Sequence, residues 1–345
     1  MDDGARHLRL TRAVAVPGEN CAVLLQLRVT VPPDRTDQVL ALFEQCPGTA
    51  HLAVLGGAAV APPGDLVLAD VARESADGLV EALKDLGIDR DGAIALVTVD
   101  AAASRAAWEA EERAPGDGAD AVVWEQVVRT TAADSTLSVS YLAFLTIATL
   151  LGAIAIINDS AILVIGAMVL GPEFAPLAAL AVALVHGRRR IARTATVSLL
   201  VGFAVAIGVT ALVALVGRWL GWYGTELLTA DRPETGFITA PDRWSVVVAV
   251  LAGIAGVLSL TSAKSGALVG VFISVTTVPA AADMALSLAL GGSAEFVRAA
   301  TQLGLNLAGI LAAATVTLAL QKLLWRRLPR STPPLARLHA ERPRI

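Results

Sequence analysis

Two apolar stretches carry a proline and a carboxylic acid at positions where an ordinary membrane-spanning helix would have neither. The first runs from Asn158 to Val185, NDSAILVIGAMVLGPEFAPLAALAVALV, and the second from Ser265 to Leu290, SGALVGVFISVTTVPAAADMALSLAL. Both exceed the roughly 20 apolar residues that cross a bilayer. Proline removes a backbone donor, and an ionised acid at mid-membrane costs at least about 2.5 kcal/mol, so neither residue is neutral there. We interpret the pair as two halves of a binding site in a membrane.

The whole chain is too apolar for an ordinary soluble protein, since 55% of its 345 residues are hydrophobic and 17% are charged. The apolar excess lies after residue 136. Residues 1–120 hold 20 acidic and 10 basic residues, whereas residues 121–345 hold 11 and 17. An acidic front segment argues against a nucleic acid partner, because phosphate binding needs a positive surface. The sequence therefore predicts a membrane protein with an acidic front domain.

Motifs of soluble enzymes and of metal centres are missing from the sequence. There is no HExxH, no glycine-rich phosphate loop and no GxSxG, and Cys21 and Cys46 lack CxxC spacing. We expect no enzymatic activity, no cofactor and no metal site. The N-terminus has no apolar signal-peptide core, so we expect the front domain to stay in the cytoplasm.

The front domain alternates between strand-like and helix-like patterns in the order βαββαβ, which is the ferredoxin-like α+β arrangement. The predicted elements are Cys21–Val31, Asp34–Gln45, His51–Ala59, Asp65–Ala72, Ser75–Leu86 and Ala93–Val99. We assign 1–19 to an extension, 20–103 to this cytosolic domain and 104–136 to a linker. The domain could serve oligomerisation or stability, or it could bind a regulatory ligand. Within the linker, Ala121–Thr130 has an apolar side and predicts a helix that either lies on the membrane or packs against the front domain.

Six membrane spans are expected within a transmembrane domain of residues 137–325. They are Ser138–Ile157, Ala161–Val185, Ala195–Val216, Trp244–Leu260, Ser265–Leu290 and Ala299–Leu324. The basic loop His186–Arg193 and the basic residues from Lys322 onward predict that both termini face the cytoplasm of a prokaryotic cell, with the chain crossing its cytoplasmic membrane several times. The proline- and arginine-rich tail, 326–345, is expected to be disordered near anionic lipid.

An odd number of spans in each half gives the two halves opposite orientations in the membrane. The second and fifth spans then enter from opposite sides, and each has a glycine several residues before a proline: Gly166 before Pro172, and Gly270 before Pro279. Inverted repeats whose interrupted helices meet near the midplane are a recurring transporter plan. The sequence thus favours a 3+3 inverted repeat.

The same residues resemble a known family. Asn158-Asp-Ser, Gly166-Ala-Met and Pro172, followed by Gly270, Ser274, Pro279 and Asn306, are similar to the pattern of the prokaryotic membrane family called domain of unknown function 389, or the uncharacterised hydrophobic domain family. The resemblance covers about residues 137 to 325. It implies a multi-pass architecture and assigns no activity. The chain departs from the family pattern in lacking a double proline and in having Glu173 and Asp283 after its prolines.

The chemistry of the proposed site follows from the two interruptions. A proline in mid-span frees a backbone carbonyl, and freed carbonyls with half-helix ends can hold a cation or a substrate. We expect Glu173 and Asp283 to face one cavity, near the pseudo-symmetric centre. The further candidate ligands are Asn306, Ser274, Thr277, Asn158 and Asp159, and the candidate helix breaks are Gly171, Pro172, Pro176 and Pro279. The alternative is that the prolines only kink their helices while neighbouring helices satisfy the acids.

Two classes of function fit these patterns. The first is a transporter or channel for a small solute or ion, embedded in the lipid bilayer, forming a homo-oligomer and carrying a cytosolic regulatory or oligomerisation domain. The second is a membrane-anchored sensor or scaffold whose front domain binds a ligand. Buried acids and paired interrupted helices favour transport.

Overall fold

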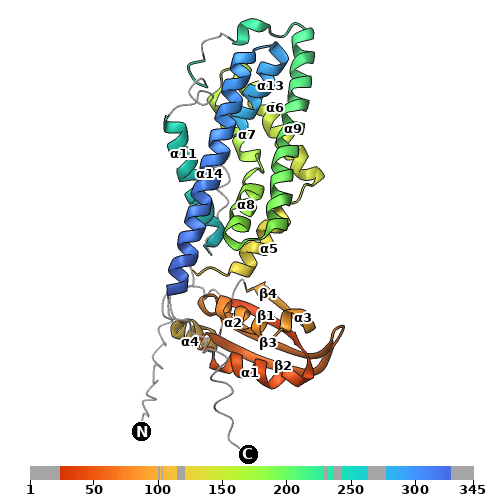
Figure 1. The fold of residues 1–345 in the computed structure, drawn as a ribbon, viewed down its shortest axis with the longest axis vertical. Helices are drawn as coiled ribbons and strands as arrows, with labels where there is room; N and C mark the ends of the chain where they lie inside the picture. Colours follow the sequence, from red (N-terminus) through yellow and green to blue (C-terminus); the bar gives the residue numbers. More distant parts are fainter. Residues whose placement is uncertain are drawn as a thin grey trace, which may run out of the picture.

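The computed structural model describes residues 24–99, 102, 104–114, 121–228, 232–235, 243–262 and 277–327. It places an α/β front domain at one end of a long helical bundle (Figure 1). The predicted extension, Ser274 and most of the predicted tail lie outside the described residues.

The front domain contains a four-stranded antiparallel sheet in the order β2-β3-β1-β4. Its strands are β1 (Leu24–Val31), β2 (Thr49–Val60), β3 (Pro63–Ala72) and β4 (Ala93–Thr98). β1 lies inside the sheet, paired with β3 on one side and β4 on the other. The element order matches the sequence pattern because the period-two alternation of each strand is a local property.

Helices α1 (Thr36–Gln45) and α2 (Arg73–Asp85), with the short α3 (Ile88–Asp91), supply apolar side chains to the core of this domain. Alternate residues of β1 point into that core, so one sheet face is covered. A 3-10 turn, η1 (Pro33–Arg35), precedes α1, and α2 begins two residues before the predicted Ser75. A fourth helix, α4 (Arg105–Arg113), contacts β2 and β3.

Helix α5 (Trp124–Asp134) connects the front domain to the bundle. Its Val127 and Val128 pack with α8 (Phe174–His186), while the Trp124 backbone N–H donates to Asp77 Oδ1 at 3.0 Å. Lys84 Nζ lies 2.6 Å from Glu125 Oε2. Of the two alternatives for this helix, packing against the front domain is therefore observed, together with packing against the bundle.

Within the described residues, four helices are long and apolar enough to cross a membrane: α6 (Val139–Ile157), α9 (Arg189–Trp219), α11 (Arg243–Thr261) and α14 (Ser293–Arg327). α7 (Ala161–Leu170) and α8 make a fifth candidate span if counted as one bent element. α13 (Val278–Leu290) is a shorter apolar helix. The rest of the predicted fifth span, 265–276, lies outside the described residues.

The bundle interior is built largely from small side chains, whereas larger apolar side chains point outward. Ala280, Ala281 and Ala282 are completely buried, while Leu200 and Leu212 on α9 are more than half exposed. α11 and α14 approach so closely that a Cβ at Gly253 would lie 2.6 Å from the Ile310 carbonyl oxygen. Small residues at helix contacts and apolar residues outside are typical of helices packed within lipid.

Candidate functional site in the interrupted helices

The second predicted span is interrupted where proline chemistry requires it. α7 ends at Leu170, Gly171 adopts an extended conformation, and α8 starts at Phe174, directly after Pro172 and Glu173. The axes of α7 and α8 differ by 52°. Pro172 has no N–H to continue the helix, and the extended residue before it suits the steric preference that proline imposes.

The other two prolines have different roles in the chain. Pro176 lies in the first turn of α8, where backbone N–H groups have no partner within the helix, so the helix continues through it. Pro279 lies in the first two positions of α13 and so starts that helix. The chain thus breaks at Gly171 and Pro172 and does not break at Pro176.

Glu173 is the N-cap residue of α8 and is completely buried. Its Oε1 accepts a hydrogen bond of 2.5 Å from the hydroxyl of Thr277, which is the N-cap residue of α13 and is also completely buried. The Tyr141 phenol of α6 interacts electrostatically with the Glu173 carboxylate. The break between α7 and α8 therefore places one carboxylate against the start of a second short helix.

Asn306 of α14 is completely buried. α13 and α14 run in opposite directions from the turn at Gly291, and similar numbers of residues separate that turn from Thr277 and from Asn306. Asn306 consequently lies at about the level of Thr277 along the helix pair. That Asn306 shares one cavity with Glu173 and Asp283 stays a prediction.

Asp283 has a different partner from Glu173. Its Oδ1 lies 3.5 Å from Arg232 Nη1; the Asp283 side chain is buried and that of Arg232 is mostly buried. Asp283 is six residues beyond Thr277 on α13, which corresponds to about 9 Å along a helix axis. That Glu173 and Asp283 share a cavity stays a prediction.

Asp159 and Asn158 lie at the turn between α6 and α7. Asp159 has a φ of 45° and accepts hydrogen bonds from Thr235 N (2.9 Å), Thr235 Oγ1 (2.7 Å) and Glu234 N (3.3 Å). Desolvation alone would raise the pKa of Asp159, but these hydrogen bonds and the charge of Arg232 hold that pKa below its ordinary value. Asn158 donates to the Ile154 carbonyl at 2.8 Å. In the structure, Asp159 anchors a loop and Asn158 caps α6.

Residues 168–312 match the family model described as domain of unknown function (DUF389). The predicted resemblance is confirmed over that range, which contains Glu173, Thr277, Asp283 and Asn306. The chain is also 26% identical over 181 residues to the uncharacterised protein MJ0678 of Methanocaldococcus jannaschii, an alignment that covers 52% of this chain and 54% of the relative. It thus spans about half the length of that relative. No solved structure matches the chain.

A buried arginine of the front domain donates hydrogen bonds to the linker and to the region that matches DUF389. Arg73, at the start of α2, donates through Nε to the Ala121 carbonyl at 2.8 Å and through Nη2 to the Thr261 carbonyl at 3.4 Å. Thr261 is the last residue of α11. One side chain therefore connects the front domain with the linker and the end of a candidate span.

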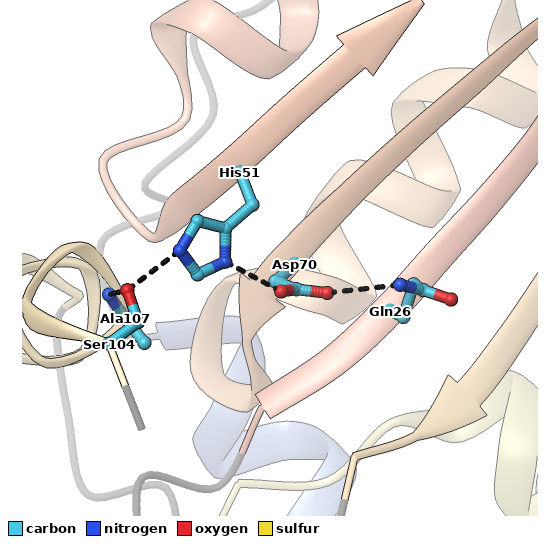
Figure 2. A network of polar contacts seen from close by, with 5 residues as sticks. All are labelled: Gln26, His51, Asp70, Ser104 and Ala107. Atoms are coloured by element: carbon cyan, nitrogen blue, oxygen red, sulfur yellow. Dashed lines mark hydrogen bonds and ion pairs between the residues drawn. The ribbon is translucent and has the colours of Figure 1, made fainter. Parts of the chain in front are cut away.

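A second polar constellation lies on the front domain, outside the DUF389 match. Figure 2 shows His51 between Asp70 and Ser104, with 2.8 Å from Nδ1 to Asp70 Oδ2 and 2.7 Å from Nε2 to Ser104 Oγ. Gln26 Nε2 donates to the other oxygen of Asp70 at 3.5 Å. Sequence reasoning missed this group because its members lie far apart in the chain, and no local motif marks them.

The same connectivity occurs in serine hydrolase triads, where histidine links an acid to a nucleophile. Here the Ser104 hydroxyl is also the N-cap acceptor of α4, receiving the Ala107 N–H at 3.4 Å. His51 belongs to β2 and Asp70 to β3. We infer that these hydrogen bonds have a structural role and fix the start of α4 against β2 and β3.

Proposed function

We propose that this chain is a membrane transporter or channel for a small solute or ion, without enzymatic activity. The observation that carries the proposal is the completely buried carboxylate of Glu173 at the bend between α7 and α8, bonded to Thr277 at the start of α13. A buried acid in an apolar bundle costs free energy and is retained where it serves a substrate or ion path. Interrupted helices supply further backbone ligands at such a point.

The geometry of α8 and α13 supports a 3+3 inverted repeat. Each has 13 residues, and each ends at a glycine with left-handed backbone, Gly187 at φ 67° and Gly291 at φ 85°. Glu173 and Thr277 hold equivalent N-cap positions on the two helices. Their hydrogen bond would then join the two repeats at their centre.

The helix contacts have the pattern that such a repeat requires. α9 packs against α6, α8 and α13, and α14 packs against α11, α13 and α8. Exchanging α6 with α11, α8 with α13 and α9 with α14 converts the first set into the second. We propose six spans on this basis, with α13 forming the described part of the fifth.

The orientation of the chain follows from the end of the bundle at which the front domain lies. The basic residues after His186 begin α9, whose first turns lie at the front-domain end in Figure 1. We propose that this end faces the prokaryotic cytoplasm, with both termini there. The sheet order β2-β3-β1-β4 supports a ferredoxin-like front domain.

Homo-oligomerisation is supported by the edge strand β2. Val54, Leu55 and Val60 on this strand are 42%, 45% and 87% exposed. An apolar sheet edge with unpaired backbone groups favours pairing with another chain. We propose that a second copy covers it.

A regulatory role for the front domain is a second candidate function, and it is compatible with transport. A cavity of about 240 Å³ is lined by residues of the front domain and α5, among them the apolar Val80, Ile94 and Leu96 and the charged Lys84, Glu125 and Arg129. A ligand there would contact the helix that joins the two parts of the chain. The Arg73 link to α11 gives such a ligand a route to the bundle.

The test of transport is ion flux by the full chain in vesicles of phosphatidylethanolamine and phosphatidylglycerol. The vesicles contain either a thallium-sensitive dye or a pH-sensitive dye, so that thallium and protons are the probes. We expect flux above that of empty vesicles, and Glu173→Gln should reduce it at least tenfold. The matched control, Glu109→Gln, changes an exposed glutamate of α4 paired with Arg105 and should leave the flux unchanged. Equal flux in wild type and Glu173→Gln would contradict a role for the break.

A further inference from the structure

The segment Arg232–Thr235, in the connection between α9 and α11, is folded back onto the bundle. Its far end is fixed by the hydrogen bonds from Glu234 and Thr235 to Asp159, and Glu234 Oε2 in turn accepts the Ala161 N–H at 3.3 Å. These contacts attach the segment to the turn between α6 and α7. The segment therefore has a defined position over the end of the bundle remote from the front domain.

Arg232 extends from this segment to α13. Only 11% of its side chain and 4% of the Asp283 side chain are exposed. One guanidinium nitrogen donates to the Leu227 carbonyl at 2.6 Å, and another reaches Asp283 Oδ1 at 3.5 Å. Strong guanidinium–carboxylate pairs are shorter, about 2.7–2.9 Å, and often use both carboxylate oxygens. The Arg232 contact with Asp283 is therefore long and one-sided.

Within the described part of the chain, four buried polar atoms on α13 and α14 have no hydrogen-bond partner. They are Asp283 Oδ2, Ser287 Oγ and both amide atoms of Gln302, and each of these residues is at most 3% exposed. Asp283 and Ser287 are one helical turn apart on α13, while Gln302 comes from α14, which packs against α13. Buried polar groups in proteins are ordinarily hydrogen-bonded, so these atoms have hydrogen-bonding capacity that a bound ligand could use.

The charged groups that act on Asp283 come from two elements, the loop and α14. Arg232 approaches from the loop, and Arg298 and Glu295 of α14 act on Asp283 electrostatically. The carboxylate, the Ser287 hydroxyl and the Gln302 amide oxygen all accept hydrogen bonds, and a planar cation with several N–H groups can donate to all three. The chemistry of the group thus matches the guanidinium that already lies beside it.

We propose that Asp283, Ser287 and Gln302 form a binding site for a small organic cation of the guanidinium or ammonium class, and that Arg232 occupies it as a tethered substitute. A cation arriving from the loop side displaces Arg232 and releases its hold on α13. The role of this site in transport rests on the proposed function above. Binding itself can be measured without any flux.

The experiment is calorimetric titration of the full chain in lipid nanodiscs with methylguanidinium chloride, at constant ionic strength. Arg232→Gln should tighten binding about tenfold, because the internal competitor is gone. The matched control is Arg218→Gln, since Arg218 also reaches α13 but donates to the Ala289 carbonyl at 3.1 Å; its affinity should equal that of the wild type. Asp283→Asn and Gln302→Leu should weaken binding, with Asp283→Asn abolishing it.

Size-exclusion profiles and thermal unfolding identify any variant that does not fold. If Asp283→Asn fails to fold, Arg232→Gln still tests the proposal, because this variant keeps all the proposed ligands and should bind methylguanidinium more tightly than the wild type. Equal affinity in Arg232→Gln and wild type would overturn the proposal, as would sodium binding equal to that of methylguanidinium. Asp283-dependent binding without vesicle flux of thallium, protons or methylguanidinium would refute transport and leave the site in place. Flux with no Asp283-dependent binding would support transport and refute the site.

Discussion

The Thr277 hydroxyl donates a 2.5 Å hydrogen bond to the Glu173 carboxylate, and both side chains are completely buried. The bond joins residues that directly precede two helices of equal length, α8 and α13. In the proposed inverted repeat, this contact would join the interrupted elements of the two halves. It also makes Thr277 the observed partner of the buried acid at the break.

Breaking this bond should destabilise the bundle in a coupled way. Glu173→Leu and Thr277→Val each remove one partner of the bond, so each is expected to lower the free energy of unfolding in detergent, and the double variant should lose less than their sum. A coupling of about 1 kcal/mol is expected for one buried hydrogen bond. Denaturant titration of the four proteins in the double-mutant cycle measures it. Strict additivity would contradict a direct interaction.

Close packing of α11 on α14 predicts opposite outcomes for two glycine substitutions. Gly253→Ala should cost about 1–3 kcal/mol, since its Cβ would lie 2.6 Å from the Ile310 carbonyl oxygen. Gly304→Ala on α14 is the control: a Cβ there meets no described atom within 4 Å, and alanine favours helix by up to about 1 kcal/mol. Thermal unfolding of both variants checks the prediction. Similar losses at the two sites would refute it.

Docking of α5 on the front domain should weaken in acid. Although desolvation opposes the shift, hydrogen bonds and charges from Lys84 and Arg129 lower the pKa of Glu125 below its ordinary value of 4.5. This stabilisation is therefore complete above pH 4.5 and is lost as the pH falls through the lower pKa of the folded protein. Hydrogen exchange of α5 at a series of pH values measures it. Glu125→Gln should remove this part of the pH dependence, and Glu109→Gln, at an exposed pair, should preserve it.

The front domain should fold when expressed alone. Residues 20–103 contain the whole sheet and both main helices, but Val123 from the linker is also completely buried in its core. Chemical unfolding should therefore show a cooperative transition for 20–103 and a more stable one for 20–136. Phe43→Ala should cost about 3–5 kcal/mol, because Phe43 is fully buried. Val60→Ala, on a side chain 87% exposed, should change stability by less than about 0.5 kcal/mol.

Membrane orientation can be tested independently of activity. In a chain with Cys21 and Cys46 replaced by serine, a cysteine at Glu226 should react with an impermeant reagent in intact cells. A cysteine at Arg189 should react only after the cells are opened. The reverse pattern would show that the front-domain end of the bundle faces outward.

Local patterns were sufficient to predict the elements of the front domain and the interruption of the second span. Alternating apolar residues specify strands, and Pro172 lacks an N–H wherever the rest of the chain lies. The same local chemistry misled at Pro176, because proline is tolerated in the first turn of a helix and the sequence does not mark where α8 begins. The apolar runs likewise predicted the long helices without stating which faces would meet.

The sequence by itself determined that Glu173 and Asp283 would lie in apolar helices and require partners, since an isolated buried charge is costly. Only the tertiary structure decided those partners: Thr277 for Glu173, and Arg232 for Asp283. It also joined His51, Asp70 and Ser104, which no motif connects. The physical reason is that hydrogen bonds and ion pairs require approach within a few ångströms. For residues as far apart as 173 and 277, that approach is set by how whole helices pack, and no local pattern encodes it.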